Sequence, residues 1–374
     1  MSARGLVALL SAALVAACGG GDNGSNNDRL LARYRQAVVD VMNRYHIPGA
    51  VAGVWVPGQA PWRIAQGFAD VPTRRPIGLD DHFSIRSITK SFTVTVLLQL
   101  VRDGSASLDD TIDRYVEGIP NGDRITLAEL AGMESGVKDY SQVPAFQQAF
   151  VMDLGRTWTP QELVAYGVSQ SPVFDPGDQY DYSNTNTVLL GLVVEKITQT
   201  PLGEAFRTRI FEPLQLSHTS YPSVVELPDP HPTPYDVDIG TGAIDEDPLI
   251  NPTALGAAGG MVSTLDDLAA WGDALGSGRL LTQELQMRRM SDAHAATNGP
   301  EYDLYGLGIG SLRGWWGHTG SGIGFQAATF RDPRTGTTIA VLVSATPTPG
   351  SSSDRELNFA QEIFAALADV VAAG

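Results

Sequence analysis

Lysine is scarce in this chain. Of the 25 basic residues, only Lys90, Lys138 and Lys196 are lysine, and the other 22 are arginine. Arginine keeps its proton in proteins, whereas a lysine whose charged form is disfavoured by burial can lose it. A position that keeps lysine in such a chain is therefore a candidate for proton transfer.

Cysteine is scarcer still, because Cys18 is the single one in 374 residues. A disulfide within the chain is therefore impossible, and a cysteine nucleophile is excluded from the mature domain. No two of the six histidines have metal-ligand spacing, so we expect neither a metal nor another cofactor. Five of them are interpreted as structural: His46, His82, His218, His231 and His294.

Three further patterns are missing. No serine has glycine two positions away on both sides, which argues against the nucleophile elbow of α/β hydrolases. No Gly-Lys pair exists, which excludes a phosphate-binding loop of the Walker A type. After residue 20, no 18 consecutive residues are apolar, so no transmembrane helix is expected in the mature chain.

Positive charge is also in deficit. The chain has 42 acidic residues against 25 basic ones, for a formal net charge of −17. This balance argues against a nucleic-acid partner and against docking on anionic lipid by charge. The hydrophobic content of 43% is ample for one large domain or two intimate subdomains.

The N-terminus has the pattern of a secretory leader. Arg4 is followed by an apolar run, 6–17, that is too short to span a membrane. The stretch "VAAC" ending at Cys18 resembles a bacterial lipobox, which implies a signal peptide over 1–17 and lipid attachment to Cys18. The alternative is an ordinary signal peptide with a chance cysteine. Residues 18–28 would then be a flexible tether, and the protein would be anchored in the bacterial cell envelope by its lipid alone.

The periodicity of the chain predicts strands at both ends and helices between them. The spacing predicts a helix over 28–45, capped by Asp28, and a hairpin of 50–56 with 62–68. Ser353 and Glu356 form a capping box that opens a final helix. Four short strands are expected before it, at 304–310, 314–319, 325–330 and 337–344.

Between these ends the chain looks mostly helical over about 86–290, although 222–252 is rich in proline and aspartate and too polar for core. We therefore expect an α+β fold in which one domain spans 29–374. Its antiparallel sheet part would comprise about 29–85 and 291–374. The mostly helical subdomain, about 86–290, would be inserted between them.

The lysine with the clearest chemical context is Lys90, three residues after Ser87. On a helix, residues three apart share a face, so the amine would lie near the serine oxygen. Serine is a poor nucleophile until a base takes its proton, and a buried lysine can be that base. The alternative is a helix start with an ordinary solvated lysine. The pattern is weak alone, because Ser135 and Lys138 repeat it.

Two later motifs strengthen the case. Tyr182-Ser183-Asn184 follows Ser87 by about 95 residues, and "HTG" begins at His318 on a late predicted strand. Taken alone, Tyr182 would be a packed tyrosine and Asn184 a helix cap. Serine hydrolases that react with penicillin carry S-x-x-K, a polar triplet and K-T-G in this order.

With these motifs, the chain resembles the serine β-lactamase and D-alanyl-D-alanine carboxypeptidase superfamily of penicillin-binding enzymes. It is most similar to class C β-lactamases and to the carboxypeptidase and esterase relatives with Y-x-N and H-T-G. The likeness covers about residues 30–370 and includes "FSIRSITKSFT" and "FDPGDQYDYSNTNTVLLGLVVEKIT". It implies the fold of that superfamily and an acyl-enzyme mechanism.

The resemblance also implies roles for individual residues. Ser87 would be the acylated nucleophile, Lys90 would take its proton, and Tyr182 would be a second proton shuttle. Asn184 would hold the substrate amide and contact Lys90. Backbone N–H groups of Ser87 and Ser321 would form the oxyanion hole.

On the late strand, His318 would stand near the substrate carboxylate, where relatives more often have lysine. Thr319 would hydrogen-bond that carboxylate, and Gly320 would leave room for substrate. Arg86 is a departure, since relatives usually have a small residue before the nucleophile. It could affect the pKa of Lys90, contact substrate or face solvent.

The activity expected first is that of a D-alanyl-D-alanine carboxypeptidase acting on a peptidoglycan peptide or another small molecule. A β-lactamase or a short-chain esterase of the same fold is the alternative within enzymes. Outside enzymes, the alternative is a silent penicillin-binding or peptide-binding envelope module. The oligomeric state is left open.

Overall fold

A nine-stranded antiparallel sheet lies at the centre of the computed structural model, which describes residues 22–350 and 357–373. Its strand order is β3-β2-β1-β13-β12-β11-β10-β9-β8. The strands are β1 Gly49–Trp55, β2 Trp62–Asp70, β3 Arg75–Pro76, β8 His294–Ala295, β9 Leu304–Tyr305, β10 Gly310–Leu312, β11 Trp315–Gly322, β12 Phe325–Arg331 and β13 Thr338–Val343. Both ends of the chain contribute strands, as the α+β prediction required.

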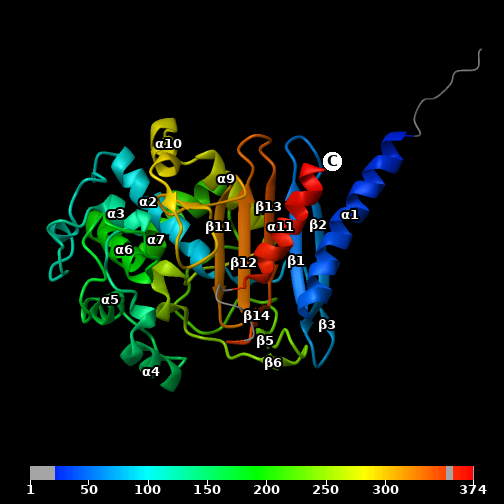
Figure 1. Ribbon diagram of the computed structural model, residues 1–374, viewed down its shortest axis with the longest axis horizontal. Helices are drawn as coiled ribbons and strands as arrows, with labels where there is room; N and C mark the ends of the chain where they lie inside the picture. Colours follow the sequence, from blue (N-terminus) through cyan, green and yellow to red (C-terminus); the bar gives the residue numbers. More distant parts are fainter. Residues whose placement is uncertain (1–21, 351–356, 374) are drawn as a thin grey trace, which may run out of the picture.

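Helices cover both faces of this sheet. The helices α1 (Asp22–Tyr45) and α11 (Phe359–Ala372) lie side by side on one face (Figure 1). The helices α2 (Thr89–Arg102) and α9 (Leu265–Ser277) belong to the hydrophobic core on the other face. Strand β1 serves both cores, because successive side chains of a strand point to opposite faces. Ala52 joins the α1–α11 core, and Val51 joins the α2–α9 core.

The predicted hairpin and the α+β class are confirmed. Strands β1 and β2 pair antiparallel, with Ala52 opposite Ile64. Strand β13 pairs with the other edge of β1, where Val341 lies opposite Ala52. This pairing joins the two ends of the chain into one sheet. The strand predicted over 304–310 is instead two short strands, β9 and β10, because Gly308 has a φ of 64° and turns the chain between them.

The ends of the two outer helices also differ from the sequence prediction. Helix α1 begins at Asp22, not at Asp28, so residues 22–28 of the predicted tether are helical. Once a helix is nucleated by its packed turns, each added residue costs little free energy. Helix α11 begins at Phe359, capped by the Asn358 side chain, which accepts a hydrogen bond from the Gln361 N–H. The predicted signal peptide, Cys18 and the capping box of Ser353 with Glu356 lie outside the described residues.

The inserted region is mostly helical and has a hydrophobic core of its own. Its further helices are α3 Leu127–Gly132, α4 Pro144–Met152, α5 Pro160–Val168, α6 Asn184–Thr198, α7 Leu202–Phe206, α8 Glu212–Leu214 and α10 Gln283–Ser291. Single turns are η1 Arg86–Ile88, η2 Ile112–Arg114, η3 Tyr140–Gln142, η4 Arg207–Phe211, η5 Pro252–Ala254 and η6 Gly256–Ala258. Within the described residues, no helix is both long and apolar enough to cross a membrane.

The proline- and aspartate-rich stretch 222–252 is not all surface. It forms β5 (Tyr235–Val237) and β6 (Ile244–Glu246), and β5 pairs with β14 (Ala345–Pro347) just beyond the main sheet. Tyr235 and Val237 are buried, which corrects the view of this stretch as too polar for core. A further small pairing joins β4 (Phe83–Ser84) to β7 (Val262–Ser263) and leads directly to the turn that carries Ser87.

Candidate active site

Ser87 lies at the start of a helix that faces the sheet. The turn η1 runs directly into α2, and the Lys90 ammonium nitrogen lies 3.0 Å from the Ser87 hydroxyl oxygen. The first N–H groups of a helix have no partner within it, and they carry partial positive charge. Ser87 therefore has a base beside its hydroxyl. Its own backbone N–H is one of the helix-start N–H groups that have no partner within the helix.

Lys90 is fully buried, with 0% of its surface exposed. Besides Ser87, its Nζ donates to Asn184 Oδ1 at 2.6 Å and to the Ala258 carbonyl oxygen at 2.8 Å. Three acceptors match the three hydrogens of an ammonium group. If the amine is neutral, the contact with Ser87 alone can reverse, so that the serine hydroxyl donates to Nζ. The geometry thus fits a base that takes the Ser87 proton.

Asn184 is held in one orientation by an aspartate that the sequence analysis missed. Its Nδ2 donates to Asp139 Oδ2 at 3.1 Å and to Ser141 Oγ at 3.2 Å, which directs Oδ1 towards Lys90. Burial raises the pKa of Asp139, although hydrogen bonds from Ser141 and the charge of Lys90 oppose that effect. The only local signal in the sequence is that Asp139 can cap the turn η3; its approach to Asn184 is a tertiary contact.

Tyr182 completes the group around Lys90, whose Nζ lies 4.9 Å from the centre of the phenol ring. The hydroxyl is buried and faces Ser87 without a hydrogen bond of ordinary geometry. Burial, reinforced by the neighbouring Tyr305 and Tyr302, raises the pKa of Tyr182 well above 10. The phenol therefore stays protonated, and it suits passing a proton on better than acting as a phenolate base.

The third motif lies on β11, whose edge beyond Gly317 is not covered by β10. On this edge the Thr319 N–H donates to the Tyr302 hydroxyl at 2.8 Å. Backbone groups of alternate strand residues point to the same edge, so the Ser321 N–H also faces the cleft. It can pair with the Ser87 N–H as an oxyanion hole, as the sequence analysis expected.

His318 is not where the resemblance implied. Its ring is fully buried, with Nδ1 donating to the Thr319 carbonyl at 2.6 Å and Nε2 accepting from the Tyr305 hydroxyl at 3.0 Å. Burial lowers its pKa to about 3, so the ring is neutral. His318 therefore does not line the cleft as a substrate-binding side chain, because strand alternation directs Thr319 into the cleft and His318 into the core.

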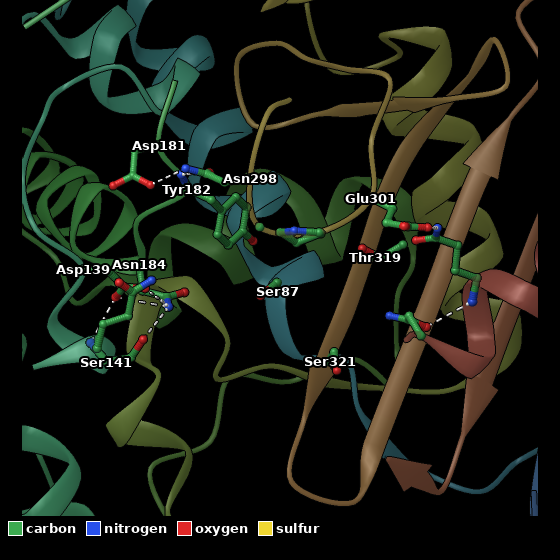
Figure 2. Close-up of a pocket in the computed structure, with 15 residues that line it drawn as sticks. Ser87, Asp139, Ser141, Asp181, Tyr182, Asn184, Asn298, Glu301, Thr319 and Ser321 are labelled. Carbon is green, nitrogen blue, oxygen red and sulfur yellow. Dashed lines mark hydrogen bonds between the residues drawn. The ribbon is translucent and has the colours of Figure 1, made fainter. Parts of the chain in front are cut away.

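These residues surround a cleft of about 520 Å³ (Figure 2). Ser87 lies at its centre, with Asp139, Ser141 and Asn184 grouped at one side and Thr319 on β11 at the other. The charged side chains that line it are carboxylates, namely Asp139, Asp181 and Glu301. No lysine, arginine or histidine is among the described residues that line the cleft. Away from Lys90, which lies buried beneath Ser87, the charge of the lining thus favours a cationic substrate group over an anionic one.

Several other lining residues were not found from the sequence. Asn298 donates to Asp181 at 2.6 Å, and its Oδ1 accepts from the Tyr182 N–H at 3.1 Å. Asn358 at the start of α11 donates to the Gly320 carbonyl at 3.1 Å. They come from loops and a helix cap that carry no motif. Across 22–350 and 357–373, no three His, Cys, Asp or Glu side chains gather as a metal site.

The second S-x-x-K is a structural feature. Gly136 has a φ of 71°, which breaks any helical spacing between Ser135 and Lys138. Ser135 donates to Asn186 Oδ1 at 2.6 Å in the core, and Lys138 donates to Gln142 at 2.7 Å on the surface. Of the two copies, the one at Ser87 alone contacts the other predicted site residues.

Fold and site together define a serine hydrolase with a lysine beside its nucleophile. The chain belongs to the Beta-lactamase family, whose model matches residues 34–362. A D-stereospecific amidohydrolase from Streptomyces sp. is 32% identical and superposes with a TM-score of 0.76 over 90% of this chain and 97% of that one. The D-amino acid amidase of Ochrobactrum anthropi SV3, solved with L-phenylalanine amide, is 25% identical, with a TM-score of 0.83 over 92% and 99%.

Curated relatives match over a shorter part of their length. A D-aminopeptidase of Brucella anthropi is 28% identical over 289 residues, which are 74% of this chain and 54% of that protein. The chain thus spans about half the length of the curated relatives it matches. The comparisons agree with a serine hydrolase of the β-lactamase family and name amidases and aminopeptidases among its relatives.

Proposed function

We propose that this enzyme hydrolyses the amide bond of substrates that carry a free, cationic amino group next to the scissile carbonyl. D-amino acid amides and peptides with an N-terminal D-residue are the substrate class. The reaction proceeds through an acyl-enzyme on Ser87. The observation that carries the proposal is the charge of the cleft, where Asp139 and Asp181 stand within the lining and no described cation does.

An ammonium group gains from nearby carboxylates in a partly desolvated cleft, whereas a carboxylate is repelled there. The relatives whose names specify a D-amino acid amidase, a D-stereospecific amidohydrolase and a D-aminopeptidase support the same substrate class. The D configuration rests on those names. The free amino group rests on the charge of the cleft.

In acylation, Ser87 Oγ attacks the amide carbon while Lys90 Nζ takes its proton. The carbonyl oxygen becomes an oxyanion between the N–H groups of Ser87 and Ser321, where the start of α2 adds favourable potential. The C–N bond then breaks, and the leaving amine takes a proton that Lys90 passes on directly or through the Tyr182 hydroxyl. The products of this half-reaction are the acyl-enzyme and the free amine.

In deacylation, a water molecule attacks the ester carbon and gives its proton to the same group of Lys90 and Tyr182. The C–O bond to Ser87 breaks, Oγ regains a proton, and the free acid leaves. The same lysine serves both half-reactions. Asp139 orients the Asn184 side chain, and Asn184 Oδ1 accepts a hydrogen bond from Lys90 Nζ, so both residues matter to acylation and to deacylation.

The carboxypeptidase predicted from the sequence is the second candidate. Its substrate ends in a carboxylate, and His318, which was expected to stand near that group, is buried and neutral. Thr319 still lines the cleft and could donate to a carboxylate. The surrounding acidic groups disfavour this alternative without changing the acyl-enzyme chemistry. A silent binding module is disfavoured by the 3.0 Å contact between Lys90 and Ser87.

A substrate series tests the proposal. D- and L-phenylalanine amide, N-acetyl-D-phenylalanine amide and N-acetyl-D-Ala-D-Ala are compared by kcat/KM, with Ser87→Ala as the blank. We expect hydrolysis of the D-amide, and a loss of about tenfold to a hundredfold on N-acetylation, because one charged hydrogen bond is removed. Equal rates for the free and acetylated amides would contradict the cationic-substrate proposal.

An intact-mass time course with a fluorescent penicillin separates the alternatives. A stable adduct on Ser87, together with release of D-alanine from N-acetyl-D-Ala-D-Ala, would favour the carboxypeptidase. Fast turnover of the penicillin would favour a β-lactamase, and cleavage confined to short acyl esters would favour an esterase. The envelope location and the lipid anchor at Cys18 stay predictions, which a mass measurement of the natively processed N-terminus would test.

A further inference from the structure

Arg86, the residue before the nucleophile, is almost completely buried, with 4% of its surface exposed. Its backbone has a φ of 48°, in the left-handed region that costs free energy for any residue except glycine. Glycine would fit this turn without strain. The strain is thus compensated by contacts that the arginine side chain makes.

Those contacts reach across to the end of β11. Arg86 Nε donates to the Gly322 carbonyl at 2.9 Å, and Nη2 donates to the Ile323 carbonyl at 2.7 Å. The guanidinium carbon lies 5.6 Å from the centre of the Phe325 ring at the start of β12. The two accepting carbonyls directly follow Ser321, whose N–H faces the cleft. Arg86 therefore links the turn of Ser87 to the strand end of Ser321.

The two segments also touch directly. A Cβ placed on Gly320 would lie 2.1 Å from the Ile85 carbonyl oxygen and 3.1 Å from Arg86 Cβ. The strand can approach the nucleophile turn this closely only because position 320 has no side chain. Gly320 sets how near the two segments come, and the paired hydrogen bonds of Arg86 set their register.

The far side of the β11–β12 turn is fixed as well. The Gly324 N–H donates to Thr346 Oγ1 at 3.1 Å, and that hydroxyl donates to Asp236 Oδ1 at 2.9 Å. Burial lowers the pKa of Arg86 to about 10, and the negative charge of Asp247 opposes that effect, so the guanidinium is charged at neutral pH. The guanidinium group is planar, so its two hydrogen bonds to the Gly322 and Ile323 carbonyls have a fixed relative geometry, which makes the link rigid.

We propose that Arg86 is a positioning residue that holds the Ser87 and Ser321 N–H groups at the separation an oxyanion needs. Arg86 is not among the residues that line the cleft around Ser87. The oxyanion hole stabilises charge that appears only in the transition state. Loosening this link therefore weakens binding of the tetrahedral intermediate and leaves ground-state binding unchanged.

The test is Arg86→Lys and Arg86→Gln in the full chain. Lysine keeps the charge but cannot donate to both carbonyls in a fixed fork. We expect kcat to fall about tenfold to a hundredfold and KM to change less than about threefold. A displacement of the oxyanion-hole N–H groups by up to about 1 Å can cause such a loss. A boronic acid that forms a tetrahedral adduct on Ser87 should lose affinity by the same factor as kcat/KM. The affinity for a D-amino acid product should stay constant.

Arg289 offers the matched control. It is a second buried arginine, with 1% exposed, and it donates to the Leu307 and Ser91 carbonyls and to Thr95 Oγ1, in the core behind α2. Arg289→Lys should lower the melting temperature, and any change in its boronate affinity should be matched by the same change in its product affinity. Near-UV circular dichroism and melting curves show which variants are folded. If Arg86→Lys and Arg86→Gln both fail to fold, boronate and product affinities of Arg86→Met decide in the same way.

Two outcomes would overturn the positioning role. One is an Arg86→Lys variant whose kcat equals that of wild type. The other is a parallel loss of boronate and product affinity, which a general loss of structure would cause. The inference rests on acylation of Ser87 and not on the natural substrate, so p-nitrophenyl acetate also serves for the rate measurement. Wild-type protein that no ester or amide acylates would count against the proposed function instead.

Discussion

The chain contains the same four-residue pattern twice, and only one copy forms part of a site. Ser87 and Lys90 begin a helix that faces the open edge of β11, and their side chains are 3.0 Å apart. Ser135 and Lys138 are separated by a left-handed glycine, and their side chains make contacts in opposite directions. The chemistry of a spaced serine and lysine thus depends on a helical backbone between them and on what the helix faces.

The two copies are nevertheless connected. Asp139, the residue directly after the second copy, holds the amide of Asn184, which in turn contacts Lys90 of the first. The second stretch therefore supports the site through its neighbour, while its own serine and lysine do not enter it. The following predictions test this division, beginning with the largest expected effect.

Lys90→Arg preserves charge but removes the base, because arginine keeps its proton. We expect kcat/KM for a D-amino acid amide to fall about 10³-fold, within the range of general-base catalysis. The same exchange at Lys138, which donates to Gln142 on the surface, should leave kcat/KM unchanged. Steady-state kinetics of the two variants make the comparison. An active Lys90→Arg enzyme would remove Lys90 from the proton path.

Asp139→Asn should lower kcat about tenfold to a hundredfold with the fold intact, because asparagine has one acceptor oxygen for the Asn184 amide and the Ser141 N–H, where the carboxylate has two. Burial raises the pKa of Asp139, so the acid side of the rate profile should carry an ionisation above that of an ordinary aspartate. This ionisation should be lost in the variant. The pH dependence of kcat for both proteins checks the expectation. An unchanged kcat in Asp139→Asn would show that Asn184 is oriented by other groups.

Ser135→Ala should affect stability and not catalysis. The substitution leaves the buried Asn186 Oδ1 and the Val137 N–H without their hydrogen-bond partner, at a cost of about 1–3 kcal/mol in the free energy of unfolding. Ser87→Ala should show the reverse, with full stability and no acylation. Denaturant unfolding together with intact mass after treatment with penicillin separates the two. A stable, inactive Ser135→Ala protein would contradict the assignment of roles.

At neutral pH the smallest effect is expected from the buried histidine beside the site. The pKa of His318 is lowered by burial from 6.5 to about 3, so below pH 6.5 the unfolded chain binds a proton that the folded protein does not. Stability should therefore fall as pH decreases from about 6.5 towards 3. His318→Gln should show a shallower decline of melting temperature between pH 7 and pH 4. Equal slopes for both proteins would mean that the ring is protonated in the folded state.

The sequence analysis succeeded where the signal is local. The hairpin of β1 and β2 follows from alternating apolar runs around Pro57-Gly58, and the nucleophile helix follows from Ser87, Lys90 and the apolar run after them. It failed where a boundary depends on contacts elsewhere. Strands β9 and β10 are separated at Gly308, which packs against Val94, and α11 starts at Phe359, whose N–H donates to Gln326.

The site shows the same division. Three motifs in order predicted one site that contains Ser87, Lys90, Tyr182 and Asn184. In the structure, Lys90 contacts the other three. Asp139 and Asn298 were missed because they belong to loops without a motif. Their contacts join residues far apart in the chain, and the spacing of residues in the sequence does not predict such contacts. The burial of the His318 side chain was not foreseen, because the sequence of one strand does not reveal which face of its sheet is covered.

The sequence by itself indicated the reaction type, because the S-x-x-K, Y-x-N and H-T-G motifs follow one another in the order of a known superfamily of serine hydrolases. Only the tertiary structure decided which of two such pairs is used, which charges line the cleft and what Arg86 does. Those properties depend on segments such as η1 and β11, more than 200 residues apart in the chain, whose packing places N–H groups and carboxylates side by side. Sequence periodicity determines which residues of one helix or strand share a face. Electrostatic interactions and close backbone contacts depend on which segments the fold brings together.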